Sequence, residues 1–279
     1  MNQGSSTLTV RPGYKFVGWY HTTVNAEGQV TGIGEKVDDS YITIEGNTAK
    51  MDTPFDESGV YTKNATYWAV YQVETSVTIK YQAMVVDSGS GDPVDPQPQG
   101  FTLDRDKEDV APVNSTALGS GVKAHPTGYH FTGSWVREST MKAVTGQTQE
   151  STFAPPKDTY SDGTLTYDYY SADTYIAVYV EDDDVTITYK VGIIGGGTHS
   201  GYGEVQYADD ETVHGTQITE SLAPVTGVAH SAKALEIDTP KYVFDHWEKY
   251  NSSDVKDESF ECTTKDLALK RGAGNPGDL

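Results

Sequence analysis

Three tryptophans close a repeated aromatic segment and are the residues best suited to bind a ligand. They are Trp19, Trp135 and Trp247, which follow Tyr14, Tyr129 and Tyr242 in a Tyr-x-Phe pattern. An exposed indole ring is a stacking platform for a sugar, whereas a buried one stabilises a core by about 2–3 kcal/mol or more. No acid, base or nucleophile recurs beside these rings, so we favour core packing and keep sugar stacking as the alternative.

The other candidates for chemistry are isolated. The seven histidines show no metal-ligand spacing, and no nucleophile elbow occurs. Gly195-Gly196-Gly197 lacks the Gly-Lys-Ser/Thr that a phosphate loop requires, and Cys262 has no base nearby. A glycosidase needs a pair of carboxylates, but no carboxylate recurs at one repeat position with a fixed neighbourhood. The sequence therefore predicts no catalytic, cofactor-binding or metal-binding residue.

Two weaker patterns concern the loops and the lysines. Asp87, Asp92 and Asp95 could gather a calcium ion, but their spacing matches no calcium loop, so a solvated loop is favoured. Lys80 and Lys190 could form a lysine–asparagine isopeptide bond, but they differ by one residue in register and no fixed asparagine answers them. Neither pattern is carried into the predicted site.

With the aromatic segment, four landmarks recur in one order and at nearly the same step along the chain. Val-Thr-Ile-x-Tyr at 77–81 returns 108 residues later at 185–189, and Tyr-x-Ala-Val-Tyr at 67–71 returns at 175–179. Ala-Pro-Val at 111–113 returns at 223–225. Such periodicity is typical of a tandem array. The β-branched and aromatic content predicts a mainly β fold, organised as a tandem array of repeats of about 110 residues.

The period divides the chain into four parts. Residues 1–74 carry only the back half of a repeat, and residues 75–182 make a complete one. Residues 183–270 have the opening strand but lack the closing Tyr-x-Ala-x-Tyr strand, and residues 271–279 are expected to be a disordered tail. We expect each part to be monomeric within a longer array.

Composition excludes several partners. The 279 residues include 41 acidic and 20 basic side chains, a formal net charge of −21. This charge repels nucleic-acid backbones and anionic lipid surfaces. The sequence contains no run of eighteen apolar residues, so it predicts no membrane span. The single cysteine excludes an internal disulfide.

The second aromatic segment is one residue longer than the others. Tyr129 and Trp135 are six residues apart because Ser134 is inserted, whereas Tyr14 and Trp19 are five apart. One extra residue reverses the facing of a strand, so we predict a β-bulge at Gly133-Ser134 that keeps the tryptophan on the core side.

The segment from Gly13 to Trp19, the Tyr67 to Tyr71 strand and the Val-Thr-Ile-x-Tyr strands resemble the Listeria–Bacteroides repeat family. These are the B-repeats of internalin-like bacterial surface proteins. Ser134 and Asp245-His246 depart from the pattern, and the insertions between the strands are longer than that family explains. The resemblance implies a small α+β, β-grasp-like unit between an adhesive tip and the cell wall, without catalytic residues.

We therefore expect a non-catalytic stalk or adhesin segment of an extracellular bacterial protein at the cell surface or cell wall. Tandem units allow multivalent binding to a host protein or glycan without strong single contacts. The alternative is an array of carbohydrate-binding modules attached to a secreted glycoside hydrolase, with the three tryptophans as stacking residues. The two differ in whether an indole face is open to solvent.

Overall fold

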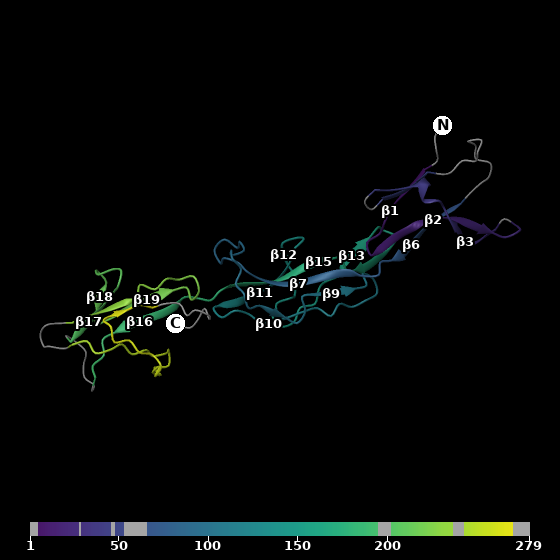
Figure 1. The fold of residues 1–279 in the computed structure, drawn as a ribbon. Helices are drawn as coiled ribbons and strands as arrows, with labels where there is room; N and C mark the ends of the chain where they lie inside the picture. Colours follow the sequence, from purple (N-terminus) through teal and green to yellow (C-terminus); the bar gives the residue numbers. More distant parts are fainter. Residues whose placement is uncertain are drawn as a thin grey trace. The chain divides into compact units, whose positions relative to one another are not determined.

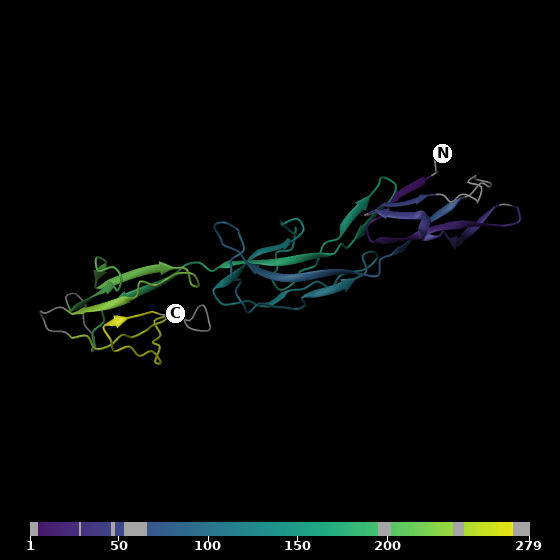
Figure 2. The same ribbon diagram turned by 45° about the horizontal axis from the view of Figure 1, so that its top comes forward.

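The structure is a computed structural model that describes residues 5–27, 29–45, 48–52, 66–194, 202–236 and 243–269 (Figures 1 and 2). The fold is mainly β, as predicted from the sequence. Within the described ranges the helical content is one short 3-10 turn, η1 (Asp39–Tyr41). The predicted tail, residues 271–279, lies outside the described residues, as do Gly195-Gly196-Gly197 and Tyr242.

Residues 1–74 form two three-stranded sheets. Their strands are β1 (Ser5–Thr9), β2 (Tyr14–Val24), β3 (Val30–Lys36), β4 (Ile42–Glu45), β5 (Thr48–Asp52) and β6 (Tyr67–Val73). One sheet has the order β1-β5-β4 and the other has the order β3-β2-β6. All the pairs that join these strands are antiparallel.

Residues 75–182 form a five-stranded sheet and two small ones. Their strands are β7 (Val77–Val85), β8 (Thr102–Leu103), β9 (Lys107–Val110), β10 (Val122–Ala124), β11 (Tyr129–Arg137), β12 (Lys142–Ala143), β13 (Asp158–Ser161), β14 (Thr166–Tyr169) and β15 (Asp173–Glu181). The large sheet has the order β12-β11-β15-β7-β9. The strands β8 and β10 pair with each other, and β13 and β14 form a hairpin.

Residues 183–270 contain a two-stranded and a four-stranded sheet. Their strands are β16 (Val185–Lys190), β17 (Gly203–Tyr207), β18 (His214–Gly215), β19 (Gln217–Leu222), β20 (Ala232–Glu236) and β21 (Asp266–Leu267). The sheets have the orders β16-β19 and β18-β17-β20-β21.

The strand pairings follow the sequence repeat. In the third part of the chain Val185 pairs with Leu222, and in the second part Val77 pairs with Val110. The β16-β19 pair thus has the register of the β7-β9 pair. Val77 and Val185 are 108 residues apart, the step of the Val-Thr-Ile-x-Tyr segment, and Val110 and Leu222 are 112 apart, the step of Ala-Pro-Val. Likewise β3-β2-β6 has the order of β12-β11-β15. The outer parts of the chain therefore each contain a different portion of the sheet that is whole in residues 75–182.

The chain also separates into two compact units, whose boundaries differ from the predicted repeat boundaries at residues 74 and 182. One unit comprises Met1–Ala83, Leu103–Lys123 and Gly133–Ala177, and the other comprises Met84–Thr102, Ala124–Thr132 and Val178–Leu279. Among the described residues, each sheet is built from strands of one range only, 1–74, 75–182 or 183–270. The division at residues 74 and 182 stays a prediction.

The inserted residue of β11 is absorbed within the strand. The N–H of Asp182 donates to the carbonyl of Gly128, and the N–H of Glu138 donates to that of Thr174. Between these two hydrogen bonds, the chain of β11 advances ten residues, from 128 to 138, and that of β15 advances eight, from 174 to 182. Strand β11 therefore holds two extra residues. Gly133 within this stretch has φ 80°, as a bulge of the glycine type requires.

The sequence interpretation missed a bulge that β2 already contains. The register of β2 against β6 shifts once, between Phe16 and Gly18, so β2 holds one extra residue where β11 holds two. Trp19 consequently pairs with Ala69, and Trp135 stays fully buried despite the insertion. The strand therefore takes up Ser134 without turning its indole away from the core.

Candidate functional site

All three tryptophans of the repeated segment are core residues. Trp19 is 6%, Trp135 0% and Trp247 8% exposed. The Trp135 ring stacks on Phe153 with centroids 4.5 Å apart, and its Nε1 donates to the carbonyl of Gln149 at 3.0 Å. A sugar could not reach these rings unless the core opened. The packing interpretation accounts for them, and the stacking role considered above loses its physical basis.

The exposed tryptophan is one that the repeat did not indicate. Trp68 on β6 is 40% exposed and pairs with Tyr20 on β2. Its counterpart one step later is Ile176, which is buried. The aromatic ring is thus not repeated along the array, and it does not make a recurring sugar platform.

The first set of contacts between two parts of the chain lies at the start of β2. Arg11 Nη2 is 2.8 Å from Asp162 Oδ2, and the Tyr167 hydroxyl donates to the carbonyl of Pro12 at 2.6 Å. The rings of Tyr14 and Tyr167 meet edge to face at 5.6 Å. Asp162 and Tyr167 belong to the β13-β14 hairpin, so this insertion contacts the preceding repeat.

Gly13 occupies a position that a larger residue could not take. Its φ is +78°, which L side chains rarely adopt, and a Cβ there would lie 2.8 Å from Cγ2 of Val113. Pro112 lies next to the same point, at 3.4 Å. The Ala-Pro-Val loop of residues 111–113 therefore packs directly against the backbone of the preceding repeat.

The equivalent Ala-Pro-Val loop, residues 223–225, makes the next connection along the chain. Glu181, the last residue of β15, accepts hydrogen bonds from the backbone N–H of Val225 at 2.6 Å and of Thr226 at 2.8 Å. The Thr226 hydroxyl donates to the other carboxylate oxygen of Glu181 at 2.7 Å. Val225 is the counterpart of Val113, so equivalent loops contact the preceding repeat at both places. We call these two sets of contacts the junctions.

Short linkers cross the junctions. Residues 74–76 join β6 to β7, and residues 182–184 join β15 to β16. At the start of each, an N–H donates back to a glycine at the beginning of the aromatic segment: Glu74 to Gly13 at 3.0 Å and Asp182 to Gly128 at 2.9 Å. Each linker is thus fixed at its first residue and has little length left in which to bend.

A half-buried arginine holds the hairpin that takes part in the first junction. Arg137 Nη2 is 2.7 Å from Asp158 Oδ2, and Arg137 also binds Asp173 and Ser171. Its hydrogen bonds to Asp158 raise the pKa of Arg137 and hold the pKa of Asp158 below its ordinary value. Since Asp158 begins β13, the ion pair anchors the hairpin that presents Tyr167.

A tyrosine–glutamate pair recurs in the structure and corrects a statement made from the sequence. The Tyr81 hydroxyl donates to Glu108, and the Tyr189 hydroxyl donates to Glu220 at 2.5 Å. These glutamates do occupy one repeat position, in the sequence Glu-x-x-Ala-Pro at 108–112 and 220–224. That shared motif was the signal that could have identified them.

The two glutamates act as structural acceptors. Glu108 also accepts from the N–H groups of Leu118 at 2.8 Å and Gly119 at 2.9 Å, and Glu220 accepts from that of His230 at 2.8 Å. Burial alone would raise the pKa of Glu108, but the hydrogen bonds from Tyr81 and the two amides hold it below its ordinary value. An ionised carboxylate whose oxygens are engaged by the backbone ties a loop to the sheet and is not free to act as a base.

The weaker candidates are accounted for by local structure. Asp87 Oδ1 accepts from the N–H groups of Gly89 and Ser90, which makes a turn. Among the described residues, no group of three or more His, Cys, Asp or Glu side chains could hold a metal ion. Cys262 is half-buried, with its sulfur 3.8 Å from the carbonyl oxygen of Thr264. No helix in the described part of the chain is long and apolar enough to cross a membrane.

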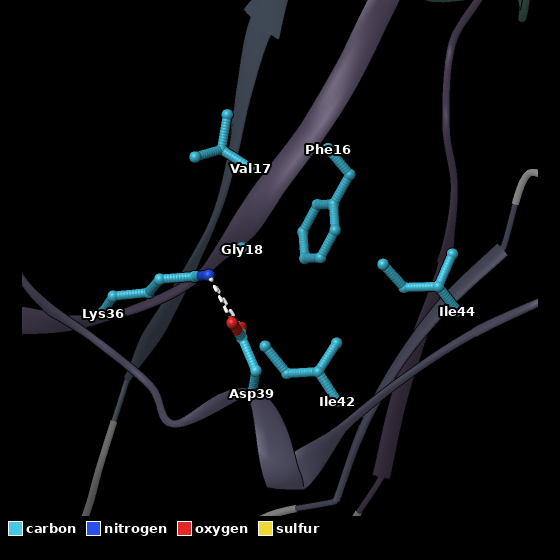
Figure 3. Close-up of a pocket in the computed structure, with 7 residues that line it drawn as sticks. All are labelled: Phe16, Val17, Gly18, Lys36, Asp39, Ile42 and Ile44. Carbon is cyan, nitrogen blue, oxygen red and sulfur yellow. Dashed lines mark hydrogen bonds and ion pairs between the residues drawn. The ribbon is translucent and has the colours of Figure 1, made fainter.

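A groove of about 200 Å³ opens in the first part of the chain (Figure 3). The ring of Phe16 forms one side, and Ile42 and Ile44 form the other. Lys36 and Asp39 lie at its rim and form an ion pair of 2.7 Å. The groove therefore has apolar side chains on two sides and an ion pair at one end.

Comparisons with protein-family models, curated proteins and solved structures give no match. Function is therefore argued from the junctions.

Proposed function

We propose that this chain is a spacer segment of a bacterial surface protein, a non-catalytic stalk whose repeats extend an adhesive part away from the cell. It acts outside the cell, at the surface or in the wall, and contacts host protein or glycan through repeated surfaces. The observation that carries the proposal is the recurrence of the junction: equivalent Ala-Pro-Val loops contact the preceding repeat at two successive positions.

The physical reason is that a spacer must resist bending between its units. A flexible linker lets the end-to-end distance grow only with about the square root of its length. Here linkers of three residues are fixed at their first N–H, and the next repeat is held by direct contacts. Contacts of this kind favour extension, and they need no catalytic group.

Adhesion through several copies follows from the same arrangement. Units held at defined spacing raise avidity by about 10²–10⁴ over one unit when their geometry matches the target. The high negative charge keeps such an array soluble and discourages association between neighbouring copies.

Small-angle X-ray scattering tests the spacer. The variant Glu181→Ala removes the acceptor of the second junction, and Tyr167→Ala removes the ring and hydroxyl of the first. The double variant is expected to broaden the distance distribution and shorten the average end-to-end distance while circular dichroism stays unchanged. Glu258→Ala, which removes an equal charge from an 84% exposed side chain, is the matched control. An unaltered distribution in the double variant would contradict the proposal.

A further inference from the structure

The first and last strands of the complete repeat are neighbours in its sheet. Strand β7 begins at Val77 and β15 ends at Glu181, and the two lie side by side in the order β12-β11-β15-β7-β9 (Figures 1 and 2). The linkers of residues 74–76 and 182–184 join these same two strands to the neighbouring parts of the chain. Tension carried along the chain therefore enters the repeat through β7 and leaves it through β15.

Two sets of contacts show that β7 and β15 run in the same direction. The N–H of Val86, just beyond β7, donates to the carbonyl of Tyr179 at 2.9 Å. Earlier in both strands, the ring of Phe153 lies 6.1 Å from that of Tyr81 and 5.0 Å from that of Tyr175. Both strands therefore advance together, from the level of Tyr81 and Tyr175 to the level of Val86 and Tyr179.

Antiparallel pairing is incompatible with the same contacts. If the strands ran in opposite directions through the hydrogen bond from Val86 to Tyr179, Tyr81 would face Asp184, beyond the end of β15. Asp184 is nine residues from Tyr175, about 30 Å along an extended strand, and one phenylalanine ring cannot span that distance. The strands are therefore parallel, with their starts toward one end of the sheet and their ends toward the other.

The two strands are shielded from water on one face and at both edges. Ile79 and Tyr81 of β7 are 0% and 1% exposed, and Tyr175 and Tyr179 of β15 are 1% and 0% exposed. Strand β11 flanks the pair at one edge and β9 flanks it at the other. Water therefore competes poorly for the hydrogen bonds between β7 and β15, and a pull on the chain must break them directly.

We propose that β7 and β15 form a force-bearing clamp, which keeps the repeat folded when the chain is pulled from both sides. The hydrogen bonds of a parallel pair are evenly spaced along the strands. A pull on the two linkers slides one strand lengthwise past the other, so it loads these bonds together. A pull that parts the strands from one end breaks the bonds one after another, at a lower force. The role of the clamp in the cell rests on the proposed spacer function, because a spacer between a cell and its target carries tension.

Single-molecule force spectroscopy on the full chain tests the clamp through the placement of two cysteine handles. Two chains share Cys262→Ser, which removes the native thiol, and Asp183→Cys, which places one handle after β15. The first chain has its other handle before β7, at Thr75→Cys, and the second has it after β7, at Ser88→Cys. All three handle positions are exposed, and circular dichroism checks that both chains keep the fold.

The two chains differ only in the direction of the pull on β7. Handles at residues 75 and 183 load the parallel strands at opposite ends, whereas handles at residues 88 and 183 load them at the same end. At equal loading rate, we expect the first chain to unfold at a force about twofold higher or more, because its barrier to forced unfolding is higher.

Two outcomes would overturn the clamp. Equal forces for the two chains would mean that the pairing of β7 with β15 does not set the resistance. A higher force for the handles at residues 88 and 183 would mean that the strands are loaded in the opposite sense. The scattering measurement reports bending between repeats, whereas the handles report unfolding within one repeat. Unchanged scattering with a twofold difference in force would therefore contradict the spacer alone, and the reverse result would contradict the clamp alone.

Discussion

Gly13 and Val113 are 100 residues apart in the chain, yet a Cβ on Gly13 would lie 2.8 Å from Cγ2 of Val113. Side-chain carbons in contact stand about 3.5–4.0 Å apart, so this glycine is required by the neighbouring loop as well as by its own backbone. The aromatic segment thus begins with a glycine for two reasons, and both concern the junction.

Replacing this glycine is expected to open the first junction. Gly13→Ala introduces left-handed strain of about 1–2 kcal/mol and overpacking of about 1–3 kcal/mol. The result should be a lower free energy of unfolding and faster proteolysis in the linker at residues 74–76. Gly163→Ala is the control, since Gly163 has φ +84° but nothing within 4 Å of the added Cβ. Equal losses in both variants would show that backbone strain alone is responsible.

Trp135→Ala is expected to destabilise the second part of the chain by about 3–5 kcal/mol, because it leaves a large cavity beside Phe153. Urea denaturation followed by circular dichroism measures the loss. Trp68→Ala, at a 40% exposed site, should cost much less. If Trp135→Ala kept full stability and instead lost binding in a glycan array, the core interpretation would be wrong.

The repeats, the mainly β fold and the core position of the tryptophans could be reasoned from the sequence, because alternating aromatic and β-branched residues report their own facing. The junction could not. Arg11 meets Asp162 across 151 residues, and no local pattern announces such a contact. The bulge between Phe16 and Gly18 was missed because comparison of the copies shows only a residue that one copy has and another lacks. Strand β11 contains one extra residue besides Ser134, so the bulge shared with β2 leaves no difference in length. Glu108 and Glu220 were overlooked although both precede Ala-Pro, since the tyrosines that bind them lie 27 and 31 residues earlier.

The low pKa of Glu108 predicts sensitivity to acid. A carboxyl group whose pKa is lower in the folded chain than in the unfolded chain stabilises the fold at any pH above the unfolded pKa, which is 4.5 for a glutamate. This stability is lost as the pH falls through the folded pKa. Glu108→Gln should therefore be less stable than the parent at pH 7, by about 1–3 kcal/mol, because one charged acceptor is lost.

The difference between the two chains should shrink below pH 4.5, and thermal unfolding at pH 7 and pH 3 measures it. Glu27→Gln, at an exposed side chain, controls for removal of one negative charge. A Glu108→Gln chain with the same pH dependence as the parent would exclude a stabilising role for this carboxylate.

Arg137 links stability of the hairpin to the junction, and this link can be separated from its charge. Its guanidinium binds Asp158 through two nitrogens, at 2.5 and 2.7 Å, which a lysine ammonium cannot reproduce. Arg137→Lys should therefore destabilise the chain by about 2 kcal/mol, less than a fully buried pair would cost because Asp158 is 29% exposed.

Hydrogen exchange provides the decisive measurement for this variant. Amides of β13 and β14 should exchange faster in Arg137→Lys, and protection at Tyr14 should fall with them because Tyr167 no longer holds its position. Lys123→Ala, which removes an exposed ion pair with Asp104, should leave exchange in the hairpin unchanged. Loss of protection in the hairpin with full protection at Tyr14 would mean that the hairpin does not support the junction.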